Sequence, residues 1–253
     1  MLIAVTRPTG EELLDCELTH IDRAPIDIER AMAQHDAYLE VLRSLDVTVI
    51  ELPRLRDHPD AVFVEDIALV LPEIAVLLRP GAESRRGEVS TVVDALGDYR
   101  ECVHLEAPAT LDGGDVIVFG KRILVGQTTR SNEAGVRALA ALVAPFGYSV
   151  QGVPVRDVLH LKSAATVVDH ETVIAVPGCV DLGFLGAVIL NAHPDEPQGA
   201  NVVRIRGTLL ADASAPETIA LLRSRGDTVV EVPVDEFGKA EGAISCKGLI
   251  FEG

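Results

Sequence analysis

Residues 114–126, GDVIVFGKRILVG, contain two runs of mainly apolar, β-branched residues on either side of a glycine turn. Such a pattern predicts a β-hairpin. Three further stretches have the same form: EDIALVLPEIAVLL at 65–78, AATVVDHETVIAV at 164–176 and NVVRIRGTLLAD at 201–212. Recurrence of one supersecondary pattern along a chain indicates a repeat architecture.

Each repeat also contains a helix-like stretch with apolar residues three or four positions apart, followed by a short strand that ends near a proline. The helix-like stretches are residues 29–45, 85–96, 131–146 and 215–225. The strands that follow them are DVTVIELP at 46–53, YRECVHLEAP at 99–108, YSVQGVP at 148–154 and DTVVEVP at 227–233. Proline cannot donate a hydrogen bond to a sheet, so it marks the ends of these strands.

The fifth hairpin is incomplete, because CKGLIFEG at 246–253 supplies one strand and the chain then stops. Its missing partner is predicted to be MLIAVT at 1–6. Pairing the two terminal strands would hide the open edges of the sheet. We therefore predict an α/β fold, a five-module propeller with pseudo-fivefold symmetry closed by the terminal strands, with residues 1–253 as one catalytic domain.

Polar residues stand at the opening of every hairpin. They are Glu65 and Asp66, then Asp112, His160, Asn201 and Cys246. From Asp66 onward the spacings are 46, 48, 41 and 45 residues, which indicates equivalent positions in successive modules. In a ring, equivalent positions that face the axis meet. Taken singly, each residue is better explained as a polar strand start, but acids, a histidine and a cysteine at matching positions favour a functional site.

A thiol, an imidazole and several carboxylates in one pocket suit nucleophilic catalysis on a cation. The thiolate is the nucleophile, and an imidazole can move protons for it. Nearby carboxylates would raise the pKa of the thiol and oppose its activation. A cationic substrate between the carboxylates and the sulfur would reverse that effect, and a planar guanidinium matches paired carboxylates.

Composition excludes several other classes of function. The net charge of −17, from 22 basic and 39 acidic residues, disfavours nucleic-acid binding. The start of the chain does not resemble a signal peptide, and the apolar run at 67–78 is too short to span a bilayer, so a cytoplasmic protein is expected. Cys16, Cys102, Cys179 and Cys246 form no C-x-x-C pair. Nucleotide-binding and metalloprotease motifs are also missing, so neither of those functions is indicated.

Five segments of the chain resemble the dimethylarginine dimethylaminohydrolases of the guanidine-modifying superfamily. The segments are FVEDIALV at 63–70, RPGAESRR at 79–86, LDGGDVIVFGKRILVGQTTRSNEAG at 111–135, VLHLKSAATVV at 158–168 and GAISCKGLIF at 242–251. The resemblance implies a five-module α/β propeller that hydrolyses Nω-methylated arginine to citrulline and a methylamine. It implies neither a metal nor an organic cofactor and a small cationic guanidine as substrate. A homodimer is expected from the family and from general frequency, while the charge and the short apolar run predict neither nucleic acid nor a membrane as partner.

The resemblance also implies catalytic roles for three residues. Cys246 would attack the guanidinium carbon and form a covalent thiouronium intermediate. His160 would protonate the leaving amine and then activate water. Asp112 would support His160 or the guanidinium.

Substrate-binding roles follow from the same resemblance. Asp66 would bind the guanidinium nitrogens, with Glu65 close by, and Arg85 and Arg130 would hold the α-carboxylate. Asp60 would help to hold the α-amino group. Leu18 would belong to a lid loop at 15–27 that excludes water.

Two other functions stay open from the sequence: action on another guanidine such as arginine, and binding of a cationic amino acid without catalysis. Without the family likeness, Arg85 and Arg130 would be taken as solvated side chains and His160 as a core histidine. Related arginine deiminases usually carry an aspartate where this chain has Lys162. That difference favours an alkylated guanidine, which has fewer N–H groups to satisfy.

Overall fold

Five three-stranded sheets contain all the strands of the structure, a computed structural model that describes residues 1–253. In each sheet the middle strand pairs antiparallel with one neighbour and parallel with the other. The sheets comprise β15 (Leu249–Glu252), β1 (Leu2–Thr6) and β2 (Thr48–Glu51); β3 (Ala68–Val70), β4 (Ala75–Leu77) and β5 (Cys102–His104); β6 (Val116–Phe119), β7 (Arg122–Gln127) and β8 (Ser149–Pro154); β9 (Ala165–Val167), β10 (Thr172–Ala175) and β11 (Val188–Asn191); and β12 (Val202–Ile205), β13 (Thr208–Asp212) and β14 (Thr228–Val232).

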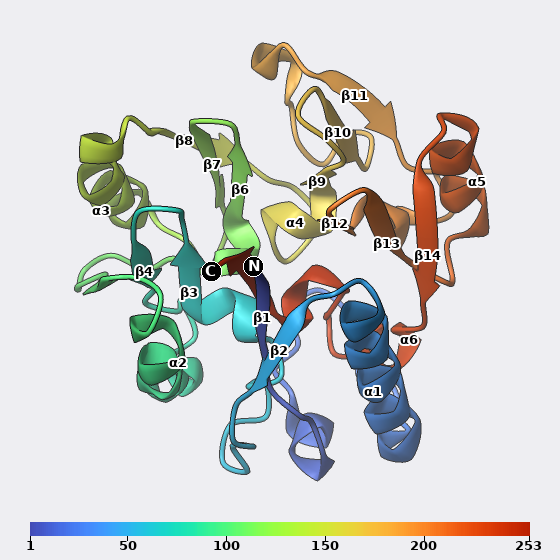
Figure 1. The fold of residues 1–253 in the computed structure, drawn as a ribbon, viewed down its shortest axis with the longest axis horizontal. Helices are drawn as coiled ribbons and strands as arrows, with labels where there is room; N and C mark the ends of the chain where they lie inside the picture. The colour runs from blue at the N-terminus through green and yellow to red at the C-terminus, as the bar shows by residue number, and fades with distance from the viewer.

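Helices connect the strands and lie mostly at the outside of the molecule. Figure 1 shows α1, α2, α3 and α5 outside the sheets, while α4 lies near the centre. The α-helices are α1 (Ile28–Ser44), α2 (Val93–Gly97), α3 (Glu133–Val143), α4 (Leu161–Ala164), α5 (Pro216–Ser224) and α6 (Asp235–Gly238). The 3₁₀ segments are η1 (Glu11–Asp15), η2 (Val64–Ile67), η3 (Glu83–Val92), η4 (Gly113–Asp115), η5 (Ala144–Phe146), η6 (Gly183–Leu185), η7 (Pro197–Ala200) and η8 (Ser245–Lys247).

The first and last strands of the chain pair with each other, as predicted. β1 runs antiparallel to β15, with Leu2 opposite Glu252 and Val5 opposite Leu249. The four internal hairpins also form: β3–β4, β6–β7, β9–β10 and β12–β13. The prediction of an α/β fold with five repeated modules is therefore confirmed.

Local signals explain where the longest helices begin. The side chain of Asp27 accepts the Arg30 N–H at 3.0 Å at the start of α1, and Asn132 does the same for the Gly135 N–H at 2.8 Å in α3. Such caps satisfy N–H groups that have no partner inside the helix. The buried side of α1, which includes Tyr38, packs in the largest of five apolar clusters.

The structure differs from the sequence prediction in two places. The helix predicted at 85–96 is 3₁₀ up to Val92 and α-helical only from Val93. In this stretch the Thr91 hydroxyl donates to the Glu88 carbonyl at 2.5 Å, and such local bonds compete with a regular helix. β11, the third strand of its module, was not predicted because no long helix-like stretch precedes it.

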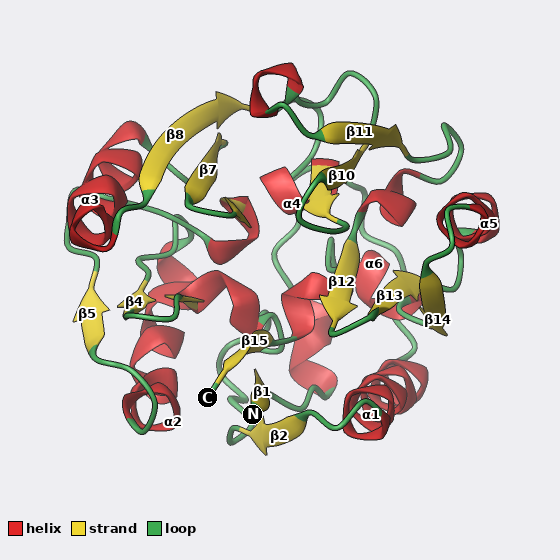
Figure 2. Cartoon of the chain, turned by 45° about the horizontal axis from the view of Figure 1, so that its top comes forward, coloured by secondary structure: helices red, strands yellow, loops and turns green.

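The five sheets lie around the centre of the molecule (Figure 2), and each apolar cluster contains residues of two neighbouring modules. Buried side chains form five clusters of 17, 13, 13, 10 and 9 residues, so no single cluster dominates. None of the helices combines the length and the apolar composition that crossing a membrane requires.

Candidate active site

A short helical turn precedes the first strand of every module, and the polar residues singled out by their spacing lie on or beside these turns. Glu65 and Asp66 lie in η2, and Cys246 lies in η8. Asp112 and His160 are the N-cap residues of η4 and α4, and Asn201 directly follows η7. The repeat therefore places these residues at equivalent points of the five modules.

Four of these residues line one pocket: Asp66, Asp112, His160 and Cys246. The two aspartates and the histidine are buried, while Cys246 is half-buried. The pocket is completed by residues of the predicted substrate site and its surroundings: Glu17, Asp60, Phe63, Arg85, Arg130, Leu159, Ala240, Glu241 and Gly242. The predicted convergence of thiol, imidazole and carboxylates in one pocket is thus present.

Asp112 orients His160. His160 Nε2 lies 3.2 Å from Asp112 Oδ2, while Asp112 Oδ1 accepts the Gly81 N–H at 2.8 Å. Burial alone would lower the pKa of His160, but the charge of Asp66 and the hydrogen bond with Asp112 outweigh burial and raise that pKa to about 9. The imidazole is therefore protonated at neutral pH and can act as an acid.

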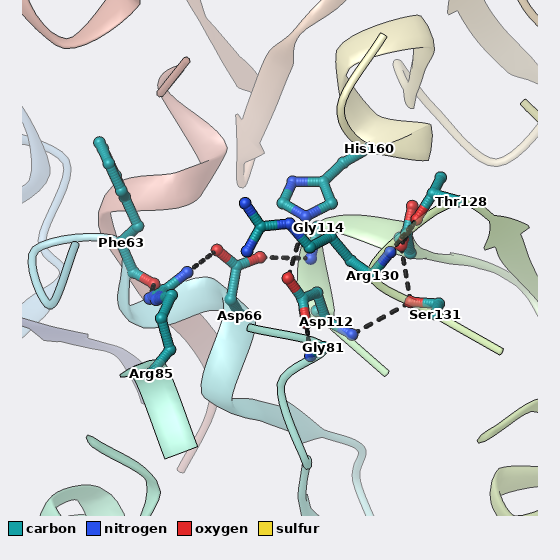
Figure 3. Close-up of polar contacts among 12 residues, drawn as sticks. Phe63, Asp66, Gly81, Arg85, Asp112, Gly114, Thr128, Arg130, Ser131 and His160 are labelled. Carbon is teal, nitrogen blue, oxygen red and sulfur yellow. Dashed lines mark hydrogen bonds and ion pairs between the residues drawn. The ribbon is translucent and has the colours of Figure 1, made fainter. Parts of the chain in front are cut away.

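Asp66 is fixed from two sides (Figure 3). Arg85 donates to its Oδ2 at 2.5 Å, and the Gly114 N–H donates to its Oδ1 at 2.9 Å. A Cβ at Gly114 would lie 2.6 Å from His160 Nδ1 and 2.9 Å from Asp66 Oδ1. The second glycine of LDGGD is therefore required by the close approach of the histidine and the aspartate.

The environment of Cys246 keeps the resting thiol protonated. Its pKa is raised, first by burial and then by the negative charges of Glu65 and Asp66. The Ala243 N–H lies 3.4 Å from the sulfur, where it would favour a thiolate. A positive charge near Asp66 would favour the thiolate further, so a cationic substrate can activate its own nucleophile.

Arg85 is occupied by the protein itself. Its guanidinium donates to Asp66, to both carboxylate oxygens of Glu88 at 3.1 and 2.9 Å, and to the carbonyl oxygens of Asp60 and Phe63. Its side chain is 6% exposed. These contacts place Arg85 as a support of Asp66, and its predicted part in holding a carboxylate stays a prediction.

We expect Arg85→Met to lower the free energy of unfolding by about 3–5 kcal/mol, since loss of one partner leaves buried Asp66 and Glu88 without a counter-charge. Urea unfolding followed by circular dichroism measures this. Arg130→Met is the matched control and should change stability by less than about 1 kcal/mol, because its ion pair reaches an exposed partner. An equal effect of both variants would contradict the supporting role of Arg85.

The predicted amino-acid end of the site lies under residues 17–20. Asp60 and Arg130 both line the pocket, and burial raises the pKa of Asp60 to about 6. Leu18 does not line it; this half-buried side chain packs against the largest apolar cluster. The loop is nevertheless in place over the site, because its neighbour Glu17 reaches both Asp60 and Arg130.

Glu65 lies outside the pocket that holds Cys246. Its Oε1 accepts from Lys162 Nζ at 2.6 Å and its Oε2 from the Ser245 hydroxyl at 2.8 Å. Asn201 Nδ2 donates to the Ser245 hydroxyl at 3.0 Å, so both residues hold the turn that carries Cys246. Contact of Glu65 with a substrate stays a prediction.

Two supporting residues were missed by sequence reasoning. Asp115 is fully buried and accepts from the hydroxyls of Thr128 and Ser131, each at 2.6 Å, and from the Leu161 N–H at 2.9 Å. It therefore joins the helical turn that follows His160 to the module that carries Asp112. Lys162 is the second supporting residue, because its ammonium pairs with Glu65. Asp115 belongs to the motif LDGGD, which drew attention to it, whereas no residue near Lys162 in the sequence indicated that it pairs with Glu65.

Asp66, Asp112 and His160 present ligand atoms within 4.8 Å of one another. Each carboxylate also has a protein donor, Arg85 for Asp66 and Gly81 for Asp112. The chemistry of the group suits a planar cation as well as a metal ion, since a guanidinium meets the same oxygens through N–H groups.

Comparison with known proteins identifies the family. The model for "N,N dimethylarginine dimethylhydrolase, eukaryotic" matches residues 20–180. An N(G),N(G)-dimethylarginine dimethylaminohydrolase of Streptomyces coelicolor is 41% identical over 245 residues, which cover 96% of this chain and 94% of that protein. The chain belongs to the dimethylarginine dimethylaminohydrolase family.

Two solved structures of dimethylarginine dimethylaminohydrolases extend the likeness to the whole fold. A cysteine-to-serine variant from Pseudomonas aeruginosa, complexed with citrulline, superposes with a TM-score of 0.93 at 30% identity and covers 98% of each chain. A histidine-to-glycine variant in adduct with S-methyl-L-thiocitrulline has a TM-score of 0.92 at 30% identity and covers 98% of this chain and 99% of that one.

Proposed function

We propose that this chain hydrolyses Nω-methylated arginine, asymmetric dimethylarginine or monomethylarginine, to citrulline and dimethylamine or methylamine through a covalent bond to Cys246. The observation that carries the proposal is the single pocket lined by Cys246, His160, Asp112 and Asp66, each from a different module. The family and its citrulline and thiocitrulline complexes support the same chemistry.

Substrate binding activates the nucleophile. The guanidinium lies against Asp66 and beside the sulfur, and its positive charge offsets the carboxylates that raise the pKa of Cys246. The thiol then releases its proton to solvent. The thiolate attacks the guanidinium carbon, and the new C–S bond gives a tetrahedral adduct.

His160 completes both halves of the reaction. As an imidazolium it donates its proton to the methylated nitrogen, the C–N bond breaks and the amine leaves a thiouronium on Cys246. The neutral imidazole next takes a proton from water, whose oxygen attacks the thiouronium carbon. The C–S bond then breaks as the hydroxyl of the adduct releases its proton to solvent, and neutral citrulline leaves the sulfur as a thiolate. The thiolate takes up a proton from solvent and returns to the resting thiol. Asp112 stabilises the imidazolium in both halves.

The amino-acid end of the substrate binds at Asp60 and Arg130. The carboxylate of Asp60 is buried, and Arg85 donates only to the backbone carbonyl oxygen of this residue. The carboxylate therefore suits the ammonium of a substrate. Arg130 supplies the positive charge for the α-carboxylate, with Arg85 behind Asp66. Leu18 and Glu65 complete the predicted set, Leu18 in the loop and Glu65 next to Asp66.

The proposal extends to the architecture and setting of the protein. The five modules form a closed α/β propeller, supported by the β1–β15 pairing, and residues 1–253 act as a single catalytic domain. A cytoplasmic location and a homodimer stay predictions from the sequence.

Citrulline release tests the proposal. We expect kcat/KM for asymmetric dimethylarginine and monomethylarginine to exceed that for arginine by about tenfold or more, since one methyl group in a fitted pocket is worth about that much. Preference for arginine would instead favour the deiminase alternative. Binding of these amino acids without release of citrulline would favour a non-catalytic binding protein.

A further inference from the structure

One loop residue, Glu17, occupies both groups at the amino-acid end of the pocket. Its backbone N–H donates to Asp60 Oδ2 at 3.2 Å, and its carboxylate Oε2 lies 3.4 Å from Arg130 Nη1. Its other carboxylate oxygen accepts from the Ser84 hydroxyl. Glu17 thus presents an N–H to the acid and a carboxylate to the arginine, as a free α-amino acid would do with its ammonium and carboxylate.

Glu241 fastens the loop in this position. Its Oε2 accepts the Thr19 N–H at 2.7 Å and its Oε1 accepts the His20 N–H at 2.6 Å. Glu241 has a positive φ of 57° and lies on the segment that leads to Cys246. A carboxylate that receives two backbone N–H groups is a strong acceptor, so this contact joins the loop directly to the turn of the nucleophile.

These contacts hold the loop weakly enough for it to be displaced. Glu17, Thr19 and His20 are exposed, and the Glu17–Arg130 pair is long at 3.4 Å. An ion pair with an exposed partner stabilises only weakly, because water screens the charges. Asp60 is buried, and the N–H of Glu17 is a weaker partner for it than an ammonium would be. A substrate with both charges can therefore displace Glu17.

We infer that Glu17 competes with the substrate for Asp60 and Arg130. We further infer that the two hydrogen bonds to Glu241 hold residues 17–20 in the position that permits this competition. This inference rests on the proposed function. Binding of an α-amino acid requires the carboxylate of Glu17 to leave Arg130, and this requirement weakens the observed affinity. Neither residue forms a hydrogen bond or an ion pair with Cys246 or His160, so the pair sets affinity and not the chemical steps.

Binding of citrulline to proteins that carry Cys246→Ser tests the inference without turnover. Glu17→Gln keeps the shape and the N–H but removes the charge, and we expect it to lower the Kd of citrulline about two- to fivefold by calorimetry. Glu11→Gln, in the same exposed stretch, is the matched control and should leave the Kd unchanged. In an Arg130→Gln background the effect of Glu17→Gln should disappear, because its partner is gone.

Hydrogen exchange tests separately whether Glu241 holds the loop. We expect Glu241→Gln to speed amide exchange in residues 17–20, while a peptide from β7 exchanges as before. An unchanged or weaker affinity for citrulline in Glu17→Gln, or unchanged exchange in Glu241→Gln, would overturn the inference. Failure of the Cys246→Ser protein to bind citrulline at all would overturn the proposed function, and the inference with it.

Discussion

Replacing Cys246 with serine should lower kcat for citrulline release by about 10⁴-fold or more, since loss of a catalytic nucleophile removes the covalent route. A serine hydroxyl at the same place has a far higher pKa than a thiol, and the carboxylates of Glu65 and Asp66 would oppose its ionisation as well. Folding should be retained, because the substitution exchanges one atom in a half-buried position. Colorimetric detection of citrulline and thermal unfolding measure the two effects.

Cys179→Ser is the matched control for this variant. Cys179 is half-buried in the segment after β10 and does not line the pocket. Its replacement should leave kcat within about twofold of the wild type, as for other changes away from the site. Substantial turnover by Cys246→Ser would remove Cys246 from the mechanism.

Asp112→Asn should lower kcat by about 10²- to 10⁴-fold, the usual range for loss of a group that orients and charges a catalytic imidazole. The variant also predicts a change in pH dependence. His160 must be protonated to expel the amine, so the rate falls as pH rises through its pKa of about 9. Without the Asp112 charge this pKa falls, and the descending limb should move to lower pH by about one unit or more.

A pH profile of kcat distinguishes this role from a structural one. A merely destabilised protein would lose activity at all pH values without moving the limb. Asp98→Asn, an exposed change at the end of α2, should leave both rate and profile as in the wild type. If the descending limb of the Asp112→Asn profile stays in place, the contact with Asp112 does not contribute to the raised pKa of His160.

Spacing along the chain predicted the centre of the site because the fold is a repeat. Asp66, Asp112, His160 and Cys246 stand at equivalent module positions and line one pocket, whereas Asn201, at the fifth such position, does not line it. The hairpins and the terminal pairing followed from alternating apolar runs for the same reason. These features depend on periodicity, which is visible in a single sequence.

Partners chosen by three-dimensional packing could not be predicted in this way. Arg85 was expected to face a substrate carboxylate, yet it is surrounded by Asp66, Glu88 and two carbonyl oxygens. Lys247 would be expected at a surface, but it is fully buried with its ammonium over the rings of Tyr38 and Phe237. These partners do not stand at equivalent positions of the modules, so the periodicity of the chain does not reveal them.

The most direct test of the mechanism is a mass spectrum of His160→Gly after mixing with S-methyl-L-thiocitrulline. Methanethiol leaves without a proton from His160, so the first half of the reaction proceeds, while hydrolysis stalls without a base for water. We expect the protein to gain the mass of the substrate less methanethiol, located on the peptide that contains Cys246. No adduct, or an adduct on any other residue, would contradict covalent catalysis by Cys246.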